Sequence, residues 1–157
     1  MSSISEELNY MAMVKAVILT ISVLLVVVSI SLAQQVSLFD SDGEARAYID
    51  FEEEASIFSW DGTPVAFLEN DGGEIAVIGF NGRFLGWYED GIIYDKNGYA
   101  VGAREDAINM MTKMERMKSM KKMTPMRPMT PMTPMKPMWK NSWSSTSLAE
   151  FLFYGKP

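Results

Sequence analysis

The chain has 157 residues and a formal net charge of −6, and it contains 14 Met but no Cys and no His. These absences exclude a disulfide framework, a lipid-modified cysteine anchor, thiol or imidazole catalysis and the common zinc sites. The length supports one domain, or one domain with appendages.

The N-terminal segment, residues 1–33, is predicted to be a secretory signal peptide. An apolar run over residues 16–32 follows Lys15 and ends at the small residues Ser31 and Ala33, which predicts cleavage after Ala33. Export would explain the missing Cys, because a free thiol is a liability in an oxidising compartment. We therefore expect a periplasmic or extracellular protein that is not attached to a membrane after cleavage.

Two points about this segment stay open. An uncleaved anchor is the alternative, since about 18 apolar residues can cross a bilayer. The start codon could encode Met1, Met11 or Met13, because Glu6 and Glu7 are unusual ahead of a signal's apolar run.

Residues 34–106 contain four copies of one pattern. Each copy has an Asp-Gly or Asn-Gly pair between apolar and aromatic residues, which is the strongest short-range signal for a β-hairpin. The four turn glycines, whose role we expect to be structural, are Gly43, Gly62, Gly82 and Gly98. A lone hairpin is marginal in water, so the four must bury their apolar faces together. The sequence predicts an all-β, compact domain with pseudo-four-fold symmetry.

The expected core of this domain is drawn from all four copies. Its members are Phe39, Phe58, Trp60, Val65, Phe67, Phe80, Leu85, Trp87, Tyr94 and Val101. A small residue stands four positions after each turn glycine, at Ala47, Ala66, Gly86 and Gly102. Recurrence at one repeat position predicts that the strands crowd there.

The stretch from IFSWDGTPVAFL to GFNGRFLGWYEDGIIYDKNGYAVG, together with WSSTSLAEFL near the C-terminus, resembles the four-fold beta flower family of exported bacterial proteins. The resemblance covers most of the chain after residue 33. It implies this fold and an envelope location. It supplies no catalytic residue, because the family has no established activity.

Residues 107–138 form a tail in which Met recurs at every third position. This Met ladder comprises Met111, Met114, Met117, Met120, Met123, Met126, Met129, Met132, Met135 and Met138. From 125 to 137 proline keeps the same period, which is incompatible with a helix and is typical of polyproline II with three residues per turn. The proline-free part, residues 107–123, could instead be helical, but the unbroken register favours one extended ladder of about 84 Å.

Charge divides the chain into two opposed parts. Residues 34–106 carry 4 basic and 16 acidic side chains, a balance of −12, whereas residues 107–157 carry 9 basic and 2 acidic ones, a balance of +7. Opposite charges attract, so we expect the tail to wrap its own acidic domain or to pair with another chain. Basic residues diluted by Met and Pro are a weak signal for nucleic acid, and we expect none to bind.

Residues 139–157 are predicted to be a clasp that holds the tail on the domain. The clasp contains Trp139 and Trp143, and Ser147 to Glu150 has the spacing of a capping box. A short helix over residues 148–153 should follow and dock with its aromatic side chains.

The acidic residues offer little chemistry. Glu52, Glu53 and Glu54 form a run that is expected to be a solvated loop, and no residue is assigned a catalytic role. The Asp40-x-Asp42-Gly43 motif lacks the spacing of a calcium loop, so its Asx side chain is expected to bond to the local backbone. We predict a protein that is not an enzyme and has no cofactor and no dedicated metal site.

The sequence therefore predicts an exported structural or interaction protein whose tail clasps its own domain or mediates self-association, with a second copy or an envelope protein as partner. The alternative is binding of Cu(I) or Ag(I), for which the thioethers of the Met ladder are suitable ligands. Against the alternative, Met also packs adaptably at apolar positions, and the ladder's apolar edge suits burial. A further alternative is carbohydrate or peptide binding by aromatic surfaces at Trp87-Tyr88 and at Trp139 with Trp143.

Overall fold

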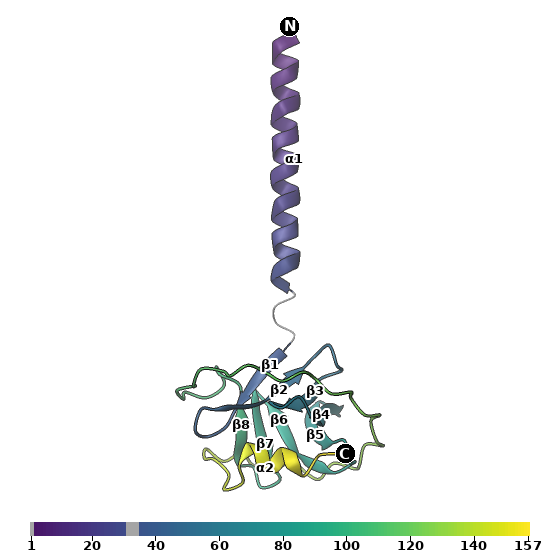
Figure 1. Ribbon diagram of the computed structural model, residues 1–157, viewed down its shortest axis with the longest axis vertical. Coiled ribbons are helices and arrows are strands. Elements are labelled where there is room, and N and C mark those ends of the chain that lie inside the picture. The colour runs from purple at the N-terminus through teal and green to yellow at the C-terminus, as the bar shows by residue number, and fades with distance from the viewer. Residues whose placement is uncertain (1, 31–34) are drawn as a thin grey trace. The chain divides into compact units, whose positions relative to one another are not determined.

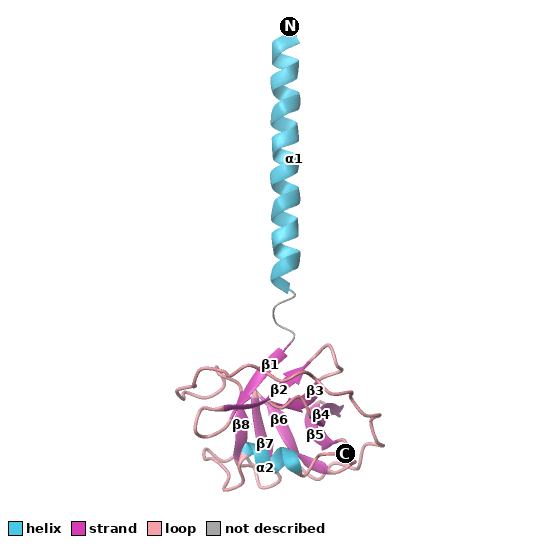
Figure 2. Cartoon of the chain, in the orientation of Figure 1, coloured by secondary structure: helices cyan, strands magenta, loops and turns pink. Residues whose placement is uncertain are grey.

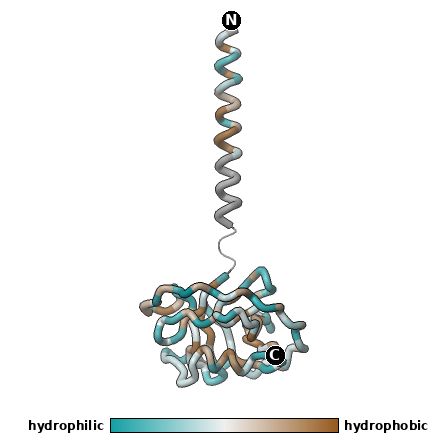
Figure 3. The backbone as a smooth tube through the Cα atoms, in the orientation of Figure 1, coloured by the Kyte–Doolittle hydropathy of each residue, from teal (hydrophilic) through white to brown (hydrophobic). Residues whose placement is uncertain are grey.

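The computed structural model describes residues 2–30 and 35–157 and divides the chain into two units, Met1–Gln34 and Gln35–Pro157 (Figure 1). The first unit contains helix α1, Ser2–Ile30, along which polar residues give way to apolar ones (Figure 3). Within the two described ranges, no helix is both long enough and apolar enough to span a membrane. The expected cleavage position after Ala33 lies outside the described residues, so the signal peptide stays a prediction.

The second unit is an eight-stranded barrel in which every strand pairs with its neighbours in antiparallel fashion (Figure 2). The order of the strands around the barrel is their order in the chain, and the ladder closes between the first and the last at Phe39 and Ala103. The strands are β1 Gln35–Phe39, β2 Ala45–Asp50, β3 Ser56–Ser59, β4 Pro64–Asp71, β5 Glu74–Gly79, β6 Phe84–Glu89, β7 Ile92–Asp95 and β8 Ala100–Ala103. The predicted all-β domain of four hairpins is confirmed.

The four hairpins share one local geometry, which explains the repeat in the sequence. Each has an irregularity in its strand register just before the turn, for example between Leu38 and Phe39. In each turn the glycine N–H donates to a carbonyl three residues earlier, as Gly43 does to Asp40. All four turn glycines have positive φ, between 71° and 84°, a region that residues with a Cβ rarely adopt.

The apolar residues form two clusters rather than one core. The interior cluster fills the barrel and includes Leu38, Ile57, Val77 and Ile93. The outer cluster lies on the other face of the strands and comprises Phe67, Ala76, Ile78, Phe80, Phe84 and Trp87. Two expected core residues, Trp60 and Tyr94, are only half-buried. The expectation of a single core was wrong because side chains alternate between the two faces of a strand, and this barrel is covered outside as well as inside.

Helix α2, Leu148–Phe153, closes the barrel interior with the side chains of Leu148, Phe151 and Leu152. The helix has the predicted bounds, and the Ser147 side chain accepts from the Glu150 N–H at 3.2 Å. This helix explains the small residue Gly102, and it adds to the crowding by strand β7 at Gly86. A Cβ at Gly102 would lie 2.8 Å from Leu148, and one at Gly86 would lie 2.0 Å from the Tyr94 carbonyl oxygen and 3.2 Å from Phe151.

Candidate interaction surface

The tail, residues 107–138, contains neither helix nor strand and passes along the outside of the barrel (Figure 1, green). The alternative that residues 107–123 are helical was therefore wrong: residues 107–109 lie in a turn and bend, and no helix follows them in the tail. Hydrogen bonds, ion pairs and ring contacts to the barrel occur from Lys113 to Lys136. The tail thus wraps its own domain, as the opposite charges of the two regions predict.

The tail meets the four hairpin turns in chain order. A Cβ at Gly43 would lie 2.2 Å from the Met111 carbonyl oxygen, one at Gly62 would lie 2.1 Å from that of Met120, and one at Gly98 would lie 2.5 Å from that of Met138. At the third turn the nearest tail atom to such a Cβ on Gly82 belongs to Pro128, at 3.5 Å. Glycine is therefore required at three of these turns by the tail as well as by the turn itself, because any side chain at those positions would collide with the tail.

Main-chain hydrogen bonds tie the tail to the same turns. The N–H groups of Lys113, Lys122 and Lys140 donate to the carbonyl oxygens of Gly43, Gly62 and Gly98 at 2.8, 2.9 and 2.8 Å. Residues 113, 122 and 140 are spaced by nine and eighteen positions. The missing position in this series is residue 131, a proline, which has no N–H to donate.

One row of tail side chains faces the barrel. This inner row is the set of every third residue from Thr112 to Lys136, and six of its nine members have a barrel partner among the described residues. They are Lys118, Lys121, Thr124, Arg127, Thr133 and Lys136, while Thr112 donates to Glu105 just after β8. A three-residue screw places such a series on one edge. The inner row therefore fixes which side of the tail faces outward.

The most buried ion pair of the inner row joins Lys121 to Asp50, with Nζ and Oδ2 2.8 Å apart. Asp50 is fully buried. Burial alone would raise its pKa, but hydrogen bonds from Lys121 and Gln35 outweigh that effect, so the pKa lies below its ordinary value. The hydrogen bond to Asp50 likewise raises the pKa of Lys121. Both groups are therefore held in their charged forms.

Four cations of the inner row lie over aromatic rings, one of them Lys121, whose Nζ is 5.7 Å from the centre of the Phe58 ring. Lys118 Nζ is 4.6 Å from the centre of the Tyr48 ring and 5.2 Å from that of Trp60, and the Arg127 guanidinium carbon is 4.4 Å from that of Phe67. Lys136 Nζ is 5.0 Å from the Trp139 ring, which itself stacks on Tyr94. Cation–π contacts of this kind are favourable, and more so where water is excluded.

The glutamate run contacts the tail at one side while staying largely exposed to solvent. Glu53 accepts from Lys121 and Thr124, and Arg127 bonds to the Glu54 carbonyl and lies 3.5 Å from its carboxylate. Glu52 and Glu54 are exposed, as expected of a solvated loop, and Glu53 is the member of the run whose carboxylate is hydrogen-bonded to the tail.

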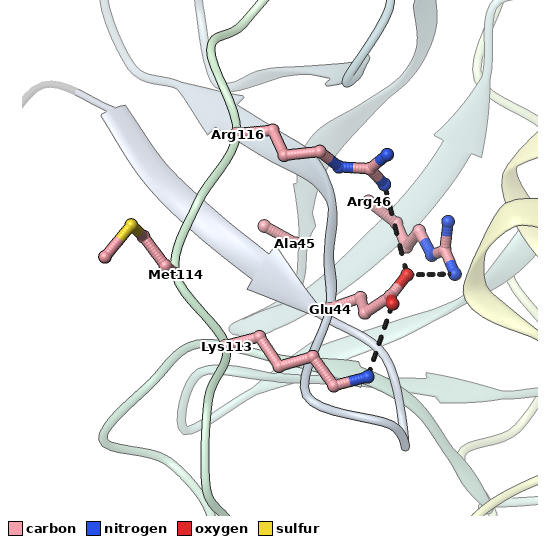
Figure 4. Close-up of a pocket in the computed structure, with 6 residues that line it drawn as sticks. All are labelled: Glu44, Ala45, Arg46, Lys113, Met114 and Arg116. Atoms are coloured by element: carbon pink, nitrogen blue, oxygen red, sulfur yellow. Dashed lines mark hydrogen bonds and ion pairs between the residues drawn. The ribbon is translucent and has the colours of Figure 1, made fainter.

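A cleft of about 490 Å³ lies between the first hairpin and the tail (Figure 4). The Glu44 carboxylate in it faces three cations, Arg46 at 2.5 Å, Lys113 at 3.3 Å and Arg116 at 4.0 Å. The side chain of Met114 points away from the cleft, on the far side of the tail backbone. The close-up thus shows both edges of the tail, one meeting the barrel and one directed outward.

The Met ladder is the outward edge. All ten of its side chains are exposed, with relative accessibilities between 86% and 97%. The expectation that this apolar edge would be buried was wrong for the chain by itself. The physical reason is that the other two edges of the screw meet the barrel, one through the inner row and one through residues such as Lys113 and Lys122, which leaves the third edge facing outward.

The aromatic residues singled out as a possible binding surface are not free. Trp87 is 2% exposed and lies in the outer cluster, and Trp139 is stacked on Tyr94 with the ring centres 4.2 Å apart. The expectation of an exposed aromatic surface at Trp87-Tyr88 was therefore wrong, because the tail and clasp cover this face of the barrel.

The Asx side chains of the turns are occupied as expected. Asp40 Oδ1 accepts from the N–H groups of Asp42 and Glu44, and Asp95 Oδ1 accepts from those of Asn97 and Tyr99. Among the described residues, no group of three acidic side chains is arranged to hold a metal ion. The motifs that resemble calcium loops are turns.

These features define a class: a closed antiparallel barrel of four like hairpins, plugged by a C-terminal helix and wrapped by its own extended tail. A family model described as 4-fold beta flower protein matches residues 36–152, and the chain belongs to that family. Neither the curated proteins nor the solved structures compared with the chain include a match.

Proposed function

We propose that this chain is an exported, non-enzymatic interaction protein of the bacterial envelope. In this proposal the barrel is a scaffold for the tail, and the tail presents the Met ladder to a partner, either a second copy or another envelope protein. The apolar run over residues 16–32 and the lack of Cys support export. The bonds of Glu53 to Lys121 and Thr124, and those of the turn Asp side chains to the local backbone, support a role without catalysis.

The exposure of the Met ladder carries this proposal. Ten long apolar side chains in register are held at 86–97% exposure by a tail whose other edges are fixed to the barrel. Large exposed apolar surfaces mark interaction sites, and Met is favoured where one surface must adapt to its partner. The cations of the tail lie against the protein's own acids, which supports an apolar partner over nucleic acid.

A matched pair of variants tests the ladder as a contact surface. In one, Met117, Met120, Met123, Met126 and Met129 are replaced by Gln, and in the other the same five are replaced by Leu. We expect the wild-type chain and the Leu variant to associate reversibly in sedimentation velocity as the protein concentration rises, and the Gln variant to stay monomeric. The proposal would be refuted if the wild type and both variants associated to the same extent. It would also be refuted if none of the three associated even when envelope extract was present.

Binding of Cu(I) or Ag(I) is the second candidate, because the exposed ladder gives solvent access to ten soft thioether ligands. Neighbouring thioethers on one polyproline II edge are about 9 Å apart, so one metal ion would have to join two chains. The same variants separate the two candidates. Anaerobic titration with Cu(I) should produce dimers of the wild type only if metal is the ligand, and the Leu variant should then lose the effect.

A further inference from the structure

The outer wall of the barrel is a binding site for an extended, basic, proline-containing segment, and the tail is the ligand seen in it. We propose that the same groove accepts the tail of a second copy, so that the chain's own tail is an intramolecular competitor. The groove is defined here by the rings of Tyr48, Phe58, Trp60 and Phe67 together with the acids beside them. This proposal uses the inner row and does not rest on the Met ladder.

The groove binds cations by charge and by ring contact. Lys118, Lys121 and Arg127 each combine a contact over a barrel ring with a hydrogen bond or ion pair to the barrel. Lys136 pairs with Glu74 and Glu89 of the barrel and lies over Trp139 of the clasp, and Lys118, Arg127 and Lys136 are each nine residues from the next. A three-residue screw returns the same edge after nine residues. The spacing of the three cations therefore matches the advance of the tail from one hairpin to the next.

The groove also bonds to the main chain, which is independent of side-chain identity. Three tail N–H groups donate to turn carbonyls, and the Trp60 ring N–H donates to the Arg116 carbonyl oxygen at 3.1 Å. Aromatic rings that line a groove and bond to backbone carbonyls are the usual means by which proteins bind polyproline II peptides. The tail thus lies in the barrel groove as a bound peptide lies in its receptor.

The barrel does not need the tail to close. All eight strands pair in a complete ring, and α2 fills the interior from beyond the tail in the sequence. The tail is a long connection between β8 and the clasp, and it is held by ion pairs, ring contacts and hydrogen bonds to turns without entering the strand ladder. It can therefore leave the groove without disrupting the strand ladder.

Competition within the molecule sets the conditions for exchange. A tethered segment has an effective concentration on the order of millimolar, so a second tail at micromolar concentration gains access only when the chain's own tail is weakened. The variant Lys118→Gln/Arg127→Gln/Lys136→Gln weakens the binding of the chain's own tail to the groove in the full-length chain, and it changes no residue of the barrel strands or of α2.

The experiment measures binding of a fluorescent peptide with the sequence of residues 110–141 to the wild-type chain and to this variant by anisotropy in low salt. We expect the peptide to bind the variant at least about tenfold more tightly than the wild type, since the groove of the wild type is occupied. A peptide carrying the same three Gln substitutions should bind neither chain. A peptide with Leu at positions 117, 126 and 135 should bind as the unmodified one does, because those side chains face away from the barrel.

Three results would overturn the proposal. They are equal binding of the unmodified peptide to both chains, binding of the Gln peptide to the variant, and no binding to a folded variant. The fold of the variant is checked by circular dichroism and thermal unfolding. Should the triple variant not fold, Lys118→Gln alone replaces it, with a smaller expected gain in affinity.

Discussion

In the barrel, apolar residues at alternate strand positions point into the protein, whereas in the tail the apolar residue of every triplet points into solvent. Ile57 is fully buried, and Met126 is 93% exposed. Both regions are built from short repeats, and both hold a fixed register. The barrel gains its register from apolar burial and strand pairing, while the tail gains its register from ion pairs, ring contacts and main-chain bonds to turns.

This difference shows that a regular apolar row marks an edge and does not by itself indicate a core. The inner row of the tail is polar because the surface beneath it is acidic and aromatic, and the Met ladder is left facing outward as a consequence. Four predictions test the contrast between the two regions, from the largest expected effect to the smallest.

The largest effect should come from the plug of the barrel interior. Leu148 is fully buried, so Leu148→Ala should lower the free energy of unfolding by about 2–5 kcal/mol through lost burial and a residual cavity. Phe153 of the same helix is 62% exposed, and Phe153→Ala should change the free energy of unfolding by no more than about 0.5 kcal/mol. Urea unfolding of the full chain measures both. Equal losses would contradict the assignment of α2 as a plug.

The next effect should come from the glycines that lie under the tail. Gly62 and Gly72 both have positive φ, 79° and 64°, so Ala at either costs about 1–2 kcal/mol in backbone strain. Only Gly62→Ala also places a Cβ 2.1 Å from a tail carbonyl oxygen, whereas nothing lies within 4 Å of a Cβ at Gly72. Gly62→Ala should therefore lower the free energy of unfolding by about 1–3 kcal/mol more than Gly72→Ala does, which is the usual range for overpacking.

Limited proteolysis separates the two causes for these glycines. Trypsin should cleave the tail between Lys113 and Lys122 faster in Gly62→Ala than in Gly72→Ala, because only the former displaces the tail. If the two variants lose the same stability and are cleaved at the same rate, the tail does not lie against the second turn in solution.

The sequence predicts the hairpins and α2 well because their signals are local. An Asp-Gly or Asn-Gly pair between apolar residues is sufficient to place each turn, and Ser147 with Glu150 is sufficient to begin the helix. The direction in which the Met ladder faces is not determined by local sequence. It depends on rings such as Tyr48 and Phe67, which lie more than fifty residues away in the chain.

One signal in the sequence could have revealed the inner row. Lys118, Arg127 and Lys136 recur at nine residues within a triplet repeat, and in three hairpins an aromatic residue follows the small one, at Tyr48, Phe67 and Trp87. The first two members of the series do meet, Lys118 over Tyr48 and Arg127 over Phe67, whereas Lys136 lies over Trp139. The division of aromatic residues between an inside and an outside cluster is harder to predict, since the register irregularity in each hairpin changes the alternation of side chains.

A smaller effect, dependent on pH, should come from the ion pair between Lys121 and Asp50. We expect Lys121→Gln to cost about 1 kcal/mol at pH 7, since Lys121 is partly exposed and water replaces some of the lost contact. Because the pKa of Asp50 is below its ordinary value, the pair stabilises the fold above about pH 4. That contribution falls as the pH drops through the folded-state pKa.

The difference in thermal unfolding between wild type and Lys121→Gln should therefore shrink from pH 7 to pH 2. Lys122→Gln is the matched control, because Lys122 is the next residue, its ammonium group hydrogen-bonds to the Thr63 hydroxyl, and its charge is only a minor cause of the lowered pKa of Asp61. If the difference in thermal unfolding between wild type and Lys121→Gln stays constant with pH, Asp50 is not the partner of Lys121. The same follows if the Lys122→Gln control shows an equal difference.

The smallest effect should come from the Met ladder itself. Met126→Thr should change the free energy of unfolding by no more than about 0.5 kcal/mol, the range for exposed positions, whereas Ile57→Thr should cost roughly 2–3 kcal/mol as a polar group enters the interior. Chemical unfolding at micromolar protein concentration measures both. A cost for Met126→Thr that grows with protein concentration would mean that the ladder is buried between copies, because a contact between two chains stabilises them by mass action. A large cost at every concentration would mean instead that the ladder packs within one chain, and the contrast between barrel and tail would not hold.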